Sequence, residues 1–398
     1  AAGASTTTTT TTTRNVCCAS SSSRARGAGV GAAAPPRRRP AVATPTRAAF
    51  VTAAVSDGAG EQPLGVLVEN ALLAAFPPSA VDRVVDSLRF TMADGVHEVH
   101  HGDKGLQQAS SYIAGLTPNP YWDVHGGTFP WLEELERNYE VIRDELLAGL
   151  NNPDLERMGN SIWVAAARDD AEGYGPDWRT LVLQDRCIWE PTNTSLFPKT
   201  AAAVEAAGAP SVEVFFAKQA PQTGIKPHTD FTNFIMTSHL GLDCPPTPQS
   251  WMKVGEETQY WENGKGMVAD TSFIHSTSNE STDQDRFVLI IRFWHPELTL
   301  DERNGVQFLF DAFEDLSPVG LSSATAKAKA RAKEYAGASA AAVKATAVEG
   351  GEAAIIAAAV EGGESDAVRG KRGGSRRKKP KRITSGGDGL GLLAKGMK

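Results

Sequence analysis

The sequence predicts a mainly β protein in which a sheet-forming core follows a helical region and lies between two compositionally biased ends. From about residue 160 the chain consists of short β-prone runs separated by Gly, Pro and Asn. Before that point the apolar residues have helical spacing, and both ends are rich in small and basic residues. Many short strands with turn residues between them favour a β-sandwich or a barrel.

Length and composition set the outer limits. A chain of 398 residues can hold two ordinary domains or one large domain with tails, and a hydrophobic fraction of 41% is typical of a globular protein. No apolar run reaches the length needed to cross a bilayer. Cys187 and Cys244 lack zinc-site spacing and are too few for a disulfide framework, so we expect a reducing compartment.

Residues 1–56 are predicted to be a disordered segment that resembles a transit peptide. They contain seven Arg and no acidic residue, with a Thr run at 6–13. An Arg- and Ser-rich, acid-poor composition is typical of organellar import, and a linker of biased composition is the alternative. The Ser/Thr/Ala bias and two stretches that resemble processing sites, Val16–Ala19 and Val51–Ala54, favour a plastid over a mitochondrion.

Residues 57–150 are predicted to be a helical flanking region. A first helix should end at Pro77-Pro78, Ser79 should cap a second one, and Ile142–Leu147 should lie in a third. Three histidines follow the second helix: His97, His100 and His101. They are candidates for a metal site, but without a partner carboxylate or Cys spacing we expect a solvated helix end or loop.

Residues 151–322 are predicted to form the β domain. The expected strands are Ile162–Ala166, Trp178–Gln184, Val212–Lys218, Asn233–Leu242, Trp251–Val254, Thr258–Trp261, Gly266–Ala269, Phe273–Thr277 and Phe287–Trp294. The turn Glu262-Asn263-Gly264-Lys265 is a hairpin signal. A short helix at about 307–315 should close the domain.

Residues 323–398 are predicted to be a disordered, basic tail rich in Ala, Gly and Lys. Such a composition cannot bury a core. The block Lys371–Arg382 could bind a polyanion or act as a nuclear localisation signal, and a solvated charged tail is the alternative. Both ends are net positive although the whole chain carries −7, so the central region is strongly acidic. We therefore expect no nucleic-acid binding through the core and no membrane span.

The candidate chemistry lies in the β domain. His228 and Asp230 are separated by one residue, His275 follows far downstream, and Arg286 begins a β-branched run. Two imidazoles and one carboxylate can occupy one face of an iron(II) octahedron, and alternate residues of an extended segment point the same way. The second His should come from a strand that folds back beside the first. An Arg can grip a carboxylate with two parallel hydrogen bonds.

The stretch from about Gly115 to Arg303 resembles the aspartyl/asparaginyl β-hydroxylase family of iron(II)- and 2-oxoglutarate-dependent dioxygenases. The matching pieces, in collinear order, are Asn119-Pro120-Tyr121-Trp122-Asp123, Phe129-Pro130-Trp131-Leu132, Arg143–Leu147, Pro227-His228-Thr229, Thr232-Asn233, His239–Leu242, Trp261-Glu262, Gly264-Lys265, Ser272-Phe273, His275 and Trp294–Leu298. The resemblance implies a double-stranded β-helix (jelly-roll, cupin-like) core with an open iron site.

The resemblance also implies roles for individual residues. His228 and His275 would bind iron, Arg286 would clamp the distal carboxylate of 2-oxoglutarate, and His239 would also contact this cosubstrate. Trp178 matches a cosubstrate position more loosely. Because ligating imidazoles must be neutral, activity should fall at acid pH.

The chain departs from the family pattern at three positions. Asp230 stands where the animal protein hydroxylase has Gly, whereas bacterial lipid A hydroxylases carry a carboxylate there, so Asp230 should complete the metal triad. Thr237 replaces an Arg that faces the cosubstrate, and Ala217 replaces a Ser. Asp270 is a candidate to orient the imidazoles, with a turn role as the alternative.

The expected function is hydroxylation of an unactivated, β-type carbon with release of succinate and CO2. The substrate would be a protein or peptide, an amino acid or an acyl chain. A transit-like segment and few Cys argue against the disulfide-rich domains on which the animal relatives act. A non-catalytic jelly-roll binding module and an iron or oxygen sensor are the alternatives.

Overall fold

The computed structural model describes residues 54–55, 62–150, 152, 164–165 and 178–336. The expected transit-like segment and the basic block Lys371–Arg382 therefore lie outside the described residues, apart from Ala54 and Val55. Of the strand expected at Ile162–Ala166, the structure describes β6 (Val164–Ala165). In the described part of the chain no helix is both long and apolar enough to cross a membrane.

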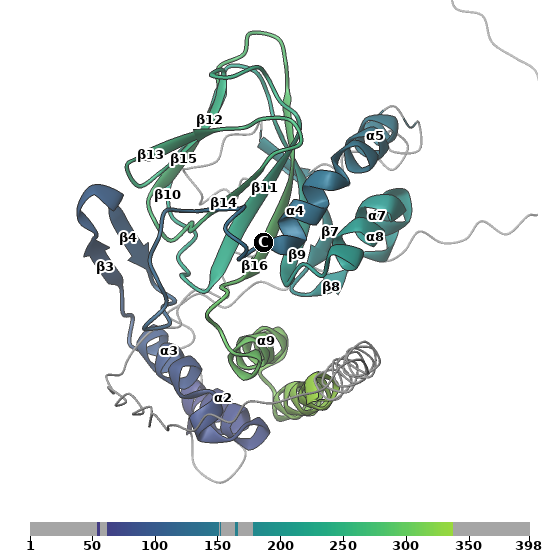
Figure 1. Cartoon of the computed structure of the whole chain (residues 1–398). Helices are drawn as coiled ribbons and strands as arrows, with labels where there is room; N and C mark the ends of the chain where they lie inside the picture. The colour runs from purple at the N-terminus through teal and green to yellow at the C-terminus, as the bar shows by residue number, and fades with distance from the viewer. Residues whose placement is uncertain (1–53, 56–61, 151, 153–163, 166–177, 337–398) are drawn as a thin grey trace, which may run out of the picture. The chain divides into compact units, whose positions relative to one another are not determined.

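The core consists of two antiparallel sheets (Figure 1). The large sheet has the order β5 (Tyr121–Trp122), β14 (Gly266–Ala269), β11 (Ile235–Asp243), β16 (Arg286–Trp294), β9 (Ser211–Gln219), β7 (Trp178–Asp185) and β6, and β8 (Ile188–Trp189) pairs with β7. The small sheet has the order β10 (Thr223–His228), β15 (His275–Asn279), β12 (Ser250–Val254) and β13 (Glu257–Tyr260).

Successive strands alternate between the two sheets. From β9 to β16 the chain crosses from the large sheet to the small one and back three times, with β12 and β13 adjacent in the small sheet. This strand order is that of a double-sheet jelly roll. The predicted double-stranded β-helix fold is confirmed.

The faces of β16 show how the sequence positions the layers. All nine of its residues are buried, and alternate side chains enter different cores. Phe287, Leu289 and Ile291 pack outward with α4 (Pro130–Arg137), α5 (Tyr139–Leu150) and α8 (Pro198–Ala207), which cover one face of the large sheet (Figure 1). Val288 and Ile290 pack inward with Met252 and Trp261, between the sheets.

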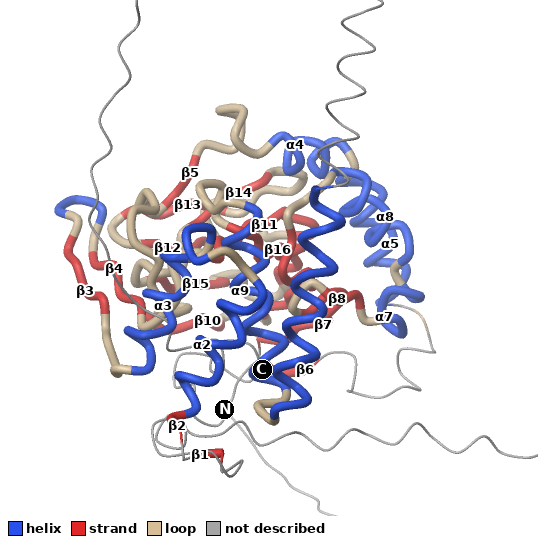
Figure 2. The backbone as a smooth tube through the Cα atoms, turned by 90° about the horizontal axis from the view of Figure 1, so that it is seen from below, coloured by secondary structure: helices blue, strands red, loops and turns tan. Residues whose placement is uncertain are grey.

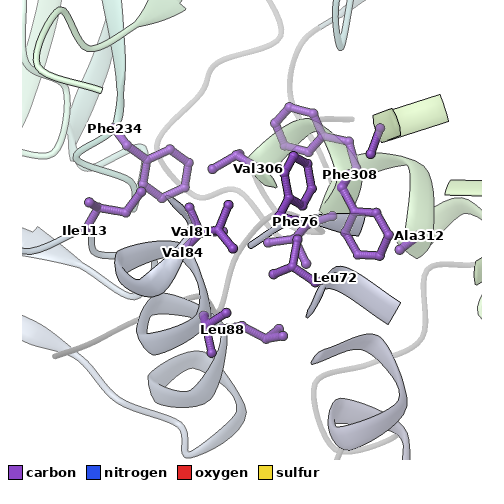
Figure 3. Close-up of a cluster of buried hydrophobic side chains, with 14 of the residues drawn as sticks. Leu72, Phe76, Val81, Val84, Leu88, Ile113, Phe234, Val306, Phe308 and Ala312 are labelled. Carbon is purple, nitrogen blue, oxygen red and sulfur yellow. The ribbon is translucent and has the colours of Figure 1, made fainter. Parts of the chain in front are cut away.

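A second helical group packs against the start of β11. Here α2 (Leu64–Ala75), α3 (Asp82–Met92) and α9 (Leu300–Glu314) share one apolar cluster, part of which Figure 3 shows around Leu72, Val84 and Phe308. Seen from below, these three helices lie in front of the sheets (Figure 2). Because Phe234 joins this cluster, the helices support the edge of the barrel beside the candidate site.

Several expectations about secondary structure are wrong. The helical flanking region also contains the hairpin β3 (His97–His100) and β4 (Leu106–Ala109), besides β5, so the three histidines lie on or next to a strand. Helices α7 (Pro191–Leu196) and α8 interrupt the expected all-β region. The turn at residues 262–265 does not close a hairpin, because β13 pairs with β12 while β14 pairs with β11 and β5.

The end of the domain also differs from expectation. The closing helix begins at Leu300 rather than at about 307, because Thr299 and Glu302 form a reciprocal capping box. Residues 318–336 are helical, and Ala324 and Ala328 are buried in the helical cluster. The expected start of a disordered tail at residue 323 is therefore wrong for residues 323–336. Residues 337–398 lie outside the described part.

Candidate active site

Two imidazoles face each other across neighbouring strands of the small sheet. His228 at the end of β10 is paired with His275 at the start of β15, and their ring centroids are 4.2 Å apart. Each Nδ1 atom lies near a backbone carbonyl two residues earlier, 2.8 Å from Lys226 and 3.0 Å from Phe273. Since a carbonyl only accepts, Nδ1 carries the hydrogen in these contacts, so the neutral form of each ring has its lone pair on Nε2.

Asp230 completes the group, but a turn rather than a strand places it. β10 ends at His228, so Asp230 lies beyond the strand, and its N–H donates to the Thr271 carbonyl at 2.9 Å. One potential ligand atom from each of His228, Asp230 and His275 lies within 4.8 Å of the others. The three donors therefore converge, although strand alternation is not the cause.

The protonation states of this group suit a divalent cation. Burial, with a smaller effect of His228, lowers the pKa of His275 to about 4. Burial alone would raise the pKa of Asp230, but Arg292 and the two imidazoles outweigh it and lower this pKa to about 2. His275 is neutral and Asp230 anionic at neutral pH, as metal ligation requires. Two nitrogen donors and one oxygen donor fit the two-His, one-carboxylate pattern of non-haem iron(II).

The other histidines and Asp270 lie outside this group. Among the described residues, no second set of three His, Cys, Asp or Glu has metal-ligating spacing, so His97, His100 and His101 form no such site. Asp270 accepts hydrogen bonds from the backbone and hydroxyl of Ser272. The turn role of Asp270 is therefore the correct alternative, because backbone carbonyls orient both imidazoles.

A buried cation lies on the inner face of the large sheet. Arg286 is 1% exposed, and its guanidinium carbon is 4.0 Å from the ring centroid of Trp261. Its Nε and Nη1 atoms have no hydrogen-bond partner within the described part of the chain. Burial lowers its pKa to about 10, so it remains charged at neutral pH. A buried, unpaired guanidinium is costly, which is the expected state of a group that binds an anion.

His239 on β11 points into the same inner layer. It is buried, its ring centroid is 5.7 Å from that of Trp261, and its Nδ1 has no partner in the described residues. Burial and the nearby Arg286 lower its pKa to about 3, so the ring is neutral. A neutral imidazole beside a guanidinium can add a directional hydrogen bond to a bound carboxylate.

Trp178 shares a face with Arg286 but lies two strands away. Gln219 on β9 is paired with Trp178 on β7 and with Arg286 on β16, so the three residues form one row across the sheet. Directly paired residues point to the same face of a sheet. Trp178 is thus placed at the Arg286 end of the inner face.

Sequence reasoning gave no role to Arg292, Glu213 or Thr271. Arg292 is buried, with Nη2 3.6 Å from Asp230 Oδ2 and Nη1 3.4 Å from Glu213 Oε2. The Thr271 hydroxyl also bonds the Asp230 carboxylate. The available signal was a charged residue between apolar neighbours within a strand, Arg292 in one strand and Glu213 in the other.

The fold and the site together define a jelly-roll protein with a candidate two-His, one-carboxylate metal centre and a buried arginine that has two unpartnered nitrogens in the described residues. Residues 136–296 match the family model described as aspartyl/asparaginyl beta-hydroxylase. The chain is similar to this family over that segment, which contains the whole His–Asp–His group and Arg286.

Several known proteins are similar to parts of this chain. The chain is 27% identical over 235 residues to human aspartyl/asparaginyl beta-hydroxylase, covering 57% of this chain and 29% of that protein. It is 28% identical over 186 residues to the ornithine lipid ester-linked acyl 2-hydroxylase of Rhizobium tropici, covering 46% and 63%. Among solved structures, a Pseudomonas putida prolyl-4-hydroxylase covers 39% of this chain and 87% of its own, with 15% identity and a TM-score of 0.25.

The matched part of each relative is limited. The chain spans less than a third of the human hydroxylase and under two thirds of the bacterial one. The names of these two relatives refer to different acceptors, amino-acid residues in one case and an acyl chain in the other.

Proposed function

We propose that the protein is an iron(II)- and 2-oxoglutarate-dependent hydroxylase. His228, Asp230 and His275 would hold the iron, and Arg286, His239 and Trp178 would bind the cosubstrate. The observation that carries the proposal is Arg286, a buried guanidinium with two unpartnered nitrogens on the same inner face as His239. A charged group in this position is explained by an anionic ligand rather than by the fold.

The arrangement suits a dicarboxylate whose two ends have different partners. One end would approach the His–Asp–His group, and the distal carboxylate would form charge-assisted hydrogen bonds with Arg286. Trp261 covers the guanidinium and excludes water from it, which strengthens those bonds. Bound iron would supply the oxidising chemistry with O2, giving succinate and CO2 together with a hydroxylated product.

The proposed acceptor is an unactivated, β-type carbon of a protein or peptide, an amino acid or an acyl chain. The relatives' names support both a side-chain and an acyl acceptor. The two thiols within the described residues, Cys187 and Cys244, are free, consistent with a chain that does not depend on disulfides.

The test is succinate release from 2-oxoglutarate by the full chain with iron(II) and O2. We expect iron-dependent turnover that His275→Ala abolishes, while His100→Ala, which removes an exposed imidazole, leaves it unchanged. Arg286→Met should raise the 2-oxoglutarate concentration for half-maximal rate by about 100-fold, because truncating one partner of a buried charge pair costs about 2–5 kcal/mol. Arg286→Lys keeps the charge but loses the planar fork, so its half-maximal 2-oxoglutarate concentration should lie between those of the parent protein and Arg286→Met.

The alternatives give different results. A non-catalytic binding module would bind neither iron nor 2-oxoglutarate in calorimetry and release no succinate. An iron or oxygen sensor would bind both and turn over slowly, with an oxygen requirement in the ambient range. Retention of three convergent donors together with Arg286 supports the enzyme, because a module has no physical need for all four.

A further inference from the structure

Arg292, the second buried arginine of β16, connects the large sheet to the metal-ligating group. Its guanidinium lies between two carboxylates, with Nη1 3.4 Å from Glu213 Oε2 and Nη2 3.6 Å from Asp230 Oδ2. The Arg292 and Glu213 side chains are 9% and 11% exposed, so neither can swing into solvent. Arg292 is therefore held in place from one side while it contacts Asp230 on the other.

The strand register shows that this contact belongs to a row of polar side chains. Thr237 on β11, Arg292 on β16 and Glu213 on β9 are directly paired across three adjacent strands. Paired residues of neighbouring strands share a face, so the row lies on the inner face. The row places a Thr, an Arg and a Glu on the same face as the apolar Val288 and Ile290.

Two members of this row, Arg292 and Thr237, lead to Asp230. Arg292 reaches the carboxylate directly, and the Thr237 hydroxyl lies 3.2 Å from that of Thr271. Thr271 in turn accepts the Asp230 N–H through its carbonyl and bonds the carboxylate through its hydroxyl. Since Asp230 lies in a turn beyond β10, no strand ladder fixes its side chain, and these contacts supply the missing constraint.

Stability alone does not explain the Arg292–Glu213 pair. Replacing a buried ion pair by well-packed apolar residues is often neutral or stabilising, so the fold gains little from keeping the charges. Arg292 is also unsuited to clamp the cosubstrate, because two protein carboxylates already lie beside its guanidinium.

We propose that Arg292, held by Glu213, is a positioning residue that fixes the Asp230 carboxylate as the third metal donor. The inference rests on the proposed function, because it requires Asp230 to bind the metal. It adds that this donor depends on the large sheet, whereas the two imidazoles depend on the small sheet.

The experiment measures manganese(II) affinity of the metal-free full chain, from the EPR signal of the free ion, in a double-mutant cycle. The pair Glu213→Gln/Arg292→Gln removes both members of the buried Arg292–Glu213 ion pair, so Glu213 is not left as an unpaired charge, and we expect it to weaken manganese binding by about 10- to 100-fold. In an Asp230→Asn background the same pair should change the affinity by less than about threefold, because a residue that acts through Asp230 has nothing left to position. Arg292→Lys should give a smaller loss that also disappears in that background.

The outcomes distinguish failure of the role inferred for Arg292 from failure of the role proposed for Asp230. An equal loss in both backgrounds would show that Arg292 acts on the fold or directly on the ion, and no loss with Asp230 intact would also overturn the inference. If Asp230→Asn alone binds manganese as tightly as the parent protein, Asp230 is not a ligand, and that part of the proposed function fails first. Thermal unfolding of each variant identifies any loss of fold. If the double variant does not fold, the manganese affinity of Arg292→Lys, with and without Asp230→Asn, tests the inference instead.

Discussion

The two buried arginines of β16 have opposite environments although they share a strand and a face. Arg286 stacks on Trp261 and has two nitrogens without a protein partner, whereas Arg292 lies between Glu213 and Asp230. Both are less than a tenth exposed, so burial does not distinguish them. The two arginines are therefore distinguished by their partners rather than by their burial. Protein carboxylates compensate the charge of Arg292, whereas two nitrogens of Arg286 have no protein partner in the described residues.

The largest expected effect is on folding stability, and it should differ between the two arginines. Arg292→Met leaves Glu213 and Asp230 as uncompensated buried carboxylates and should cost about 3–5 kcal/mol. Arg286→Met removes an unpaired buried charge and should cost nothing or stabilise the metal-free protein. Urea unfolding of the two single variants measures the contrast. Equal losses would show that Arg286 has a structural partner after all and would remove the main support for a cosubstrate site.

Much of the fold could be predicted because its strands carry their own signal. β16, β9 and β11 are apolar, β-branched or aromatic runs, and each was expected within two residues of its observed ends. β10 was missed because it is an edge strand whose exposed positions include Gly224, Lys226 and Pro227. The false hairpin at residues 262–265 has a different cause. A turn signal shows that the chain reverses, but not that the flanking strands pair.

The site was predicted only in part, because the sequence shows which residues can bind a metal but not which residues contact them. The sequence shows that His228, Asp230 and His275 are suitable ligands, and the structure brings them together. It does not show that Asp230 lies in a turn, or that Arg292 on a distant strand reaches it. Contacts of that kind depend on which residues face one another across the sheets, and this register cannot be read from one strand alone.

A middle-sized effect concerns the pH dependence of folding stability that arises from the buried His239. The folded pKa of His239, about 3, is below the ordinary value of 6.5, so the unfolded chain binds more protons as the pH falls between these values. Stability from the neutral ring is therefore complete above about pH 6.5 and is lost as the pH falls towards 3. We expect the protein to lose about 1–2 kcal/mol relative to His239→Leu between pH 7 and pH 5.

The effect of His239 on stability is the difference between the parent protein and His239→Leu at each pH. Asp270 acts in the opposite direction, because burial raises its pKa to about 7 and its protonation stabilises the folded state as the pH falls. Denaturant titrations of the metal-free protein and His239→Leu at both pH values cancel this common contribution. Parallel pH profiles would show that His239 is more solvated than its 5% exposure indicates.

The smallest expected effect concerns Trp178, which the register places at the Arg286 end of the inner face. Trp178 is two strands from Arg286 and can contribute apolar contact but no charge to a bound dicarboxylate. Trp178→Leu should therefore weaken 2-oxoglutarate binding by about threefold to tenfold, in line with the 0.5–1.5 kcal/mol typical of an aromatic contact. Trp178→Phe should lose less, and neither variant should change manganese affinity. A change in manganese affinity without a change in 2-oxoglutarate affinity would show that Trp178 acts on the metal-ligating group rather than on the cosubstrate. The role expected for Trp178 beside Arg286 would then be wrong.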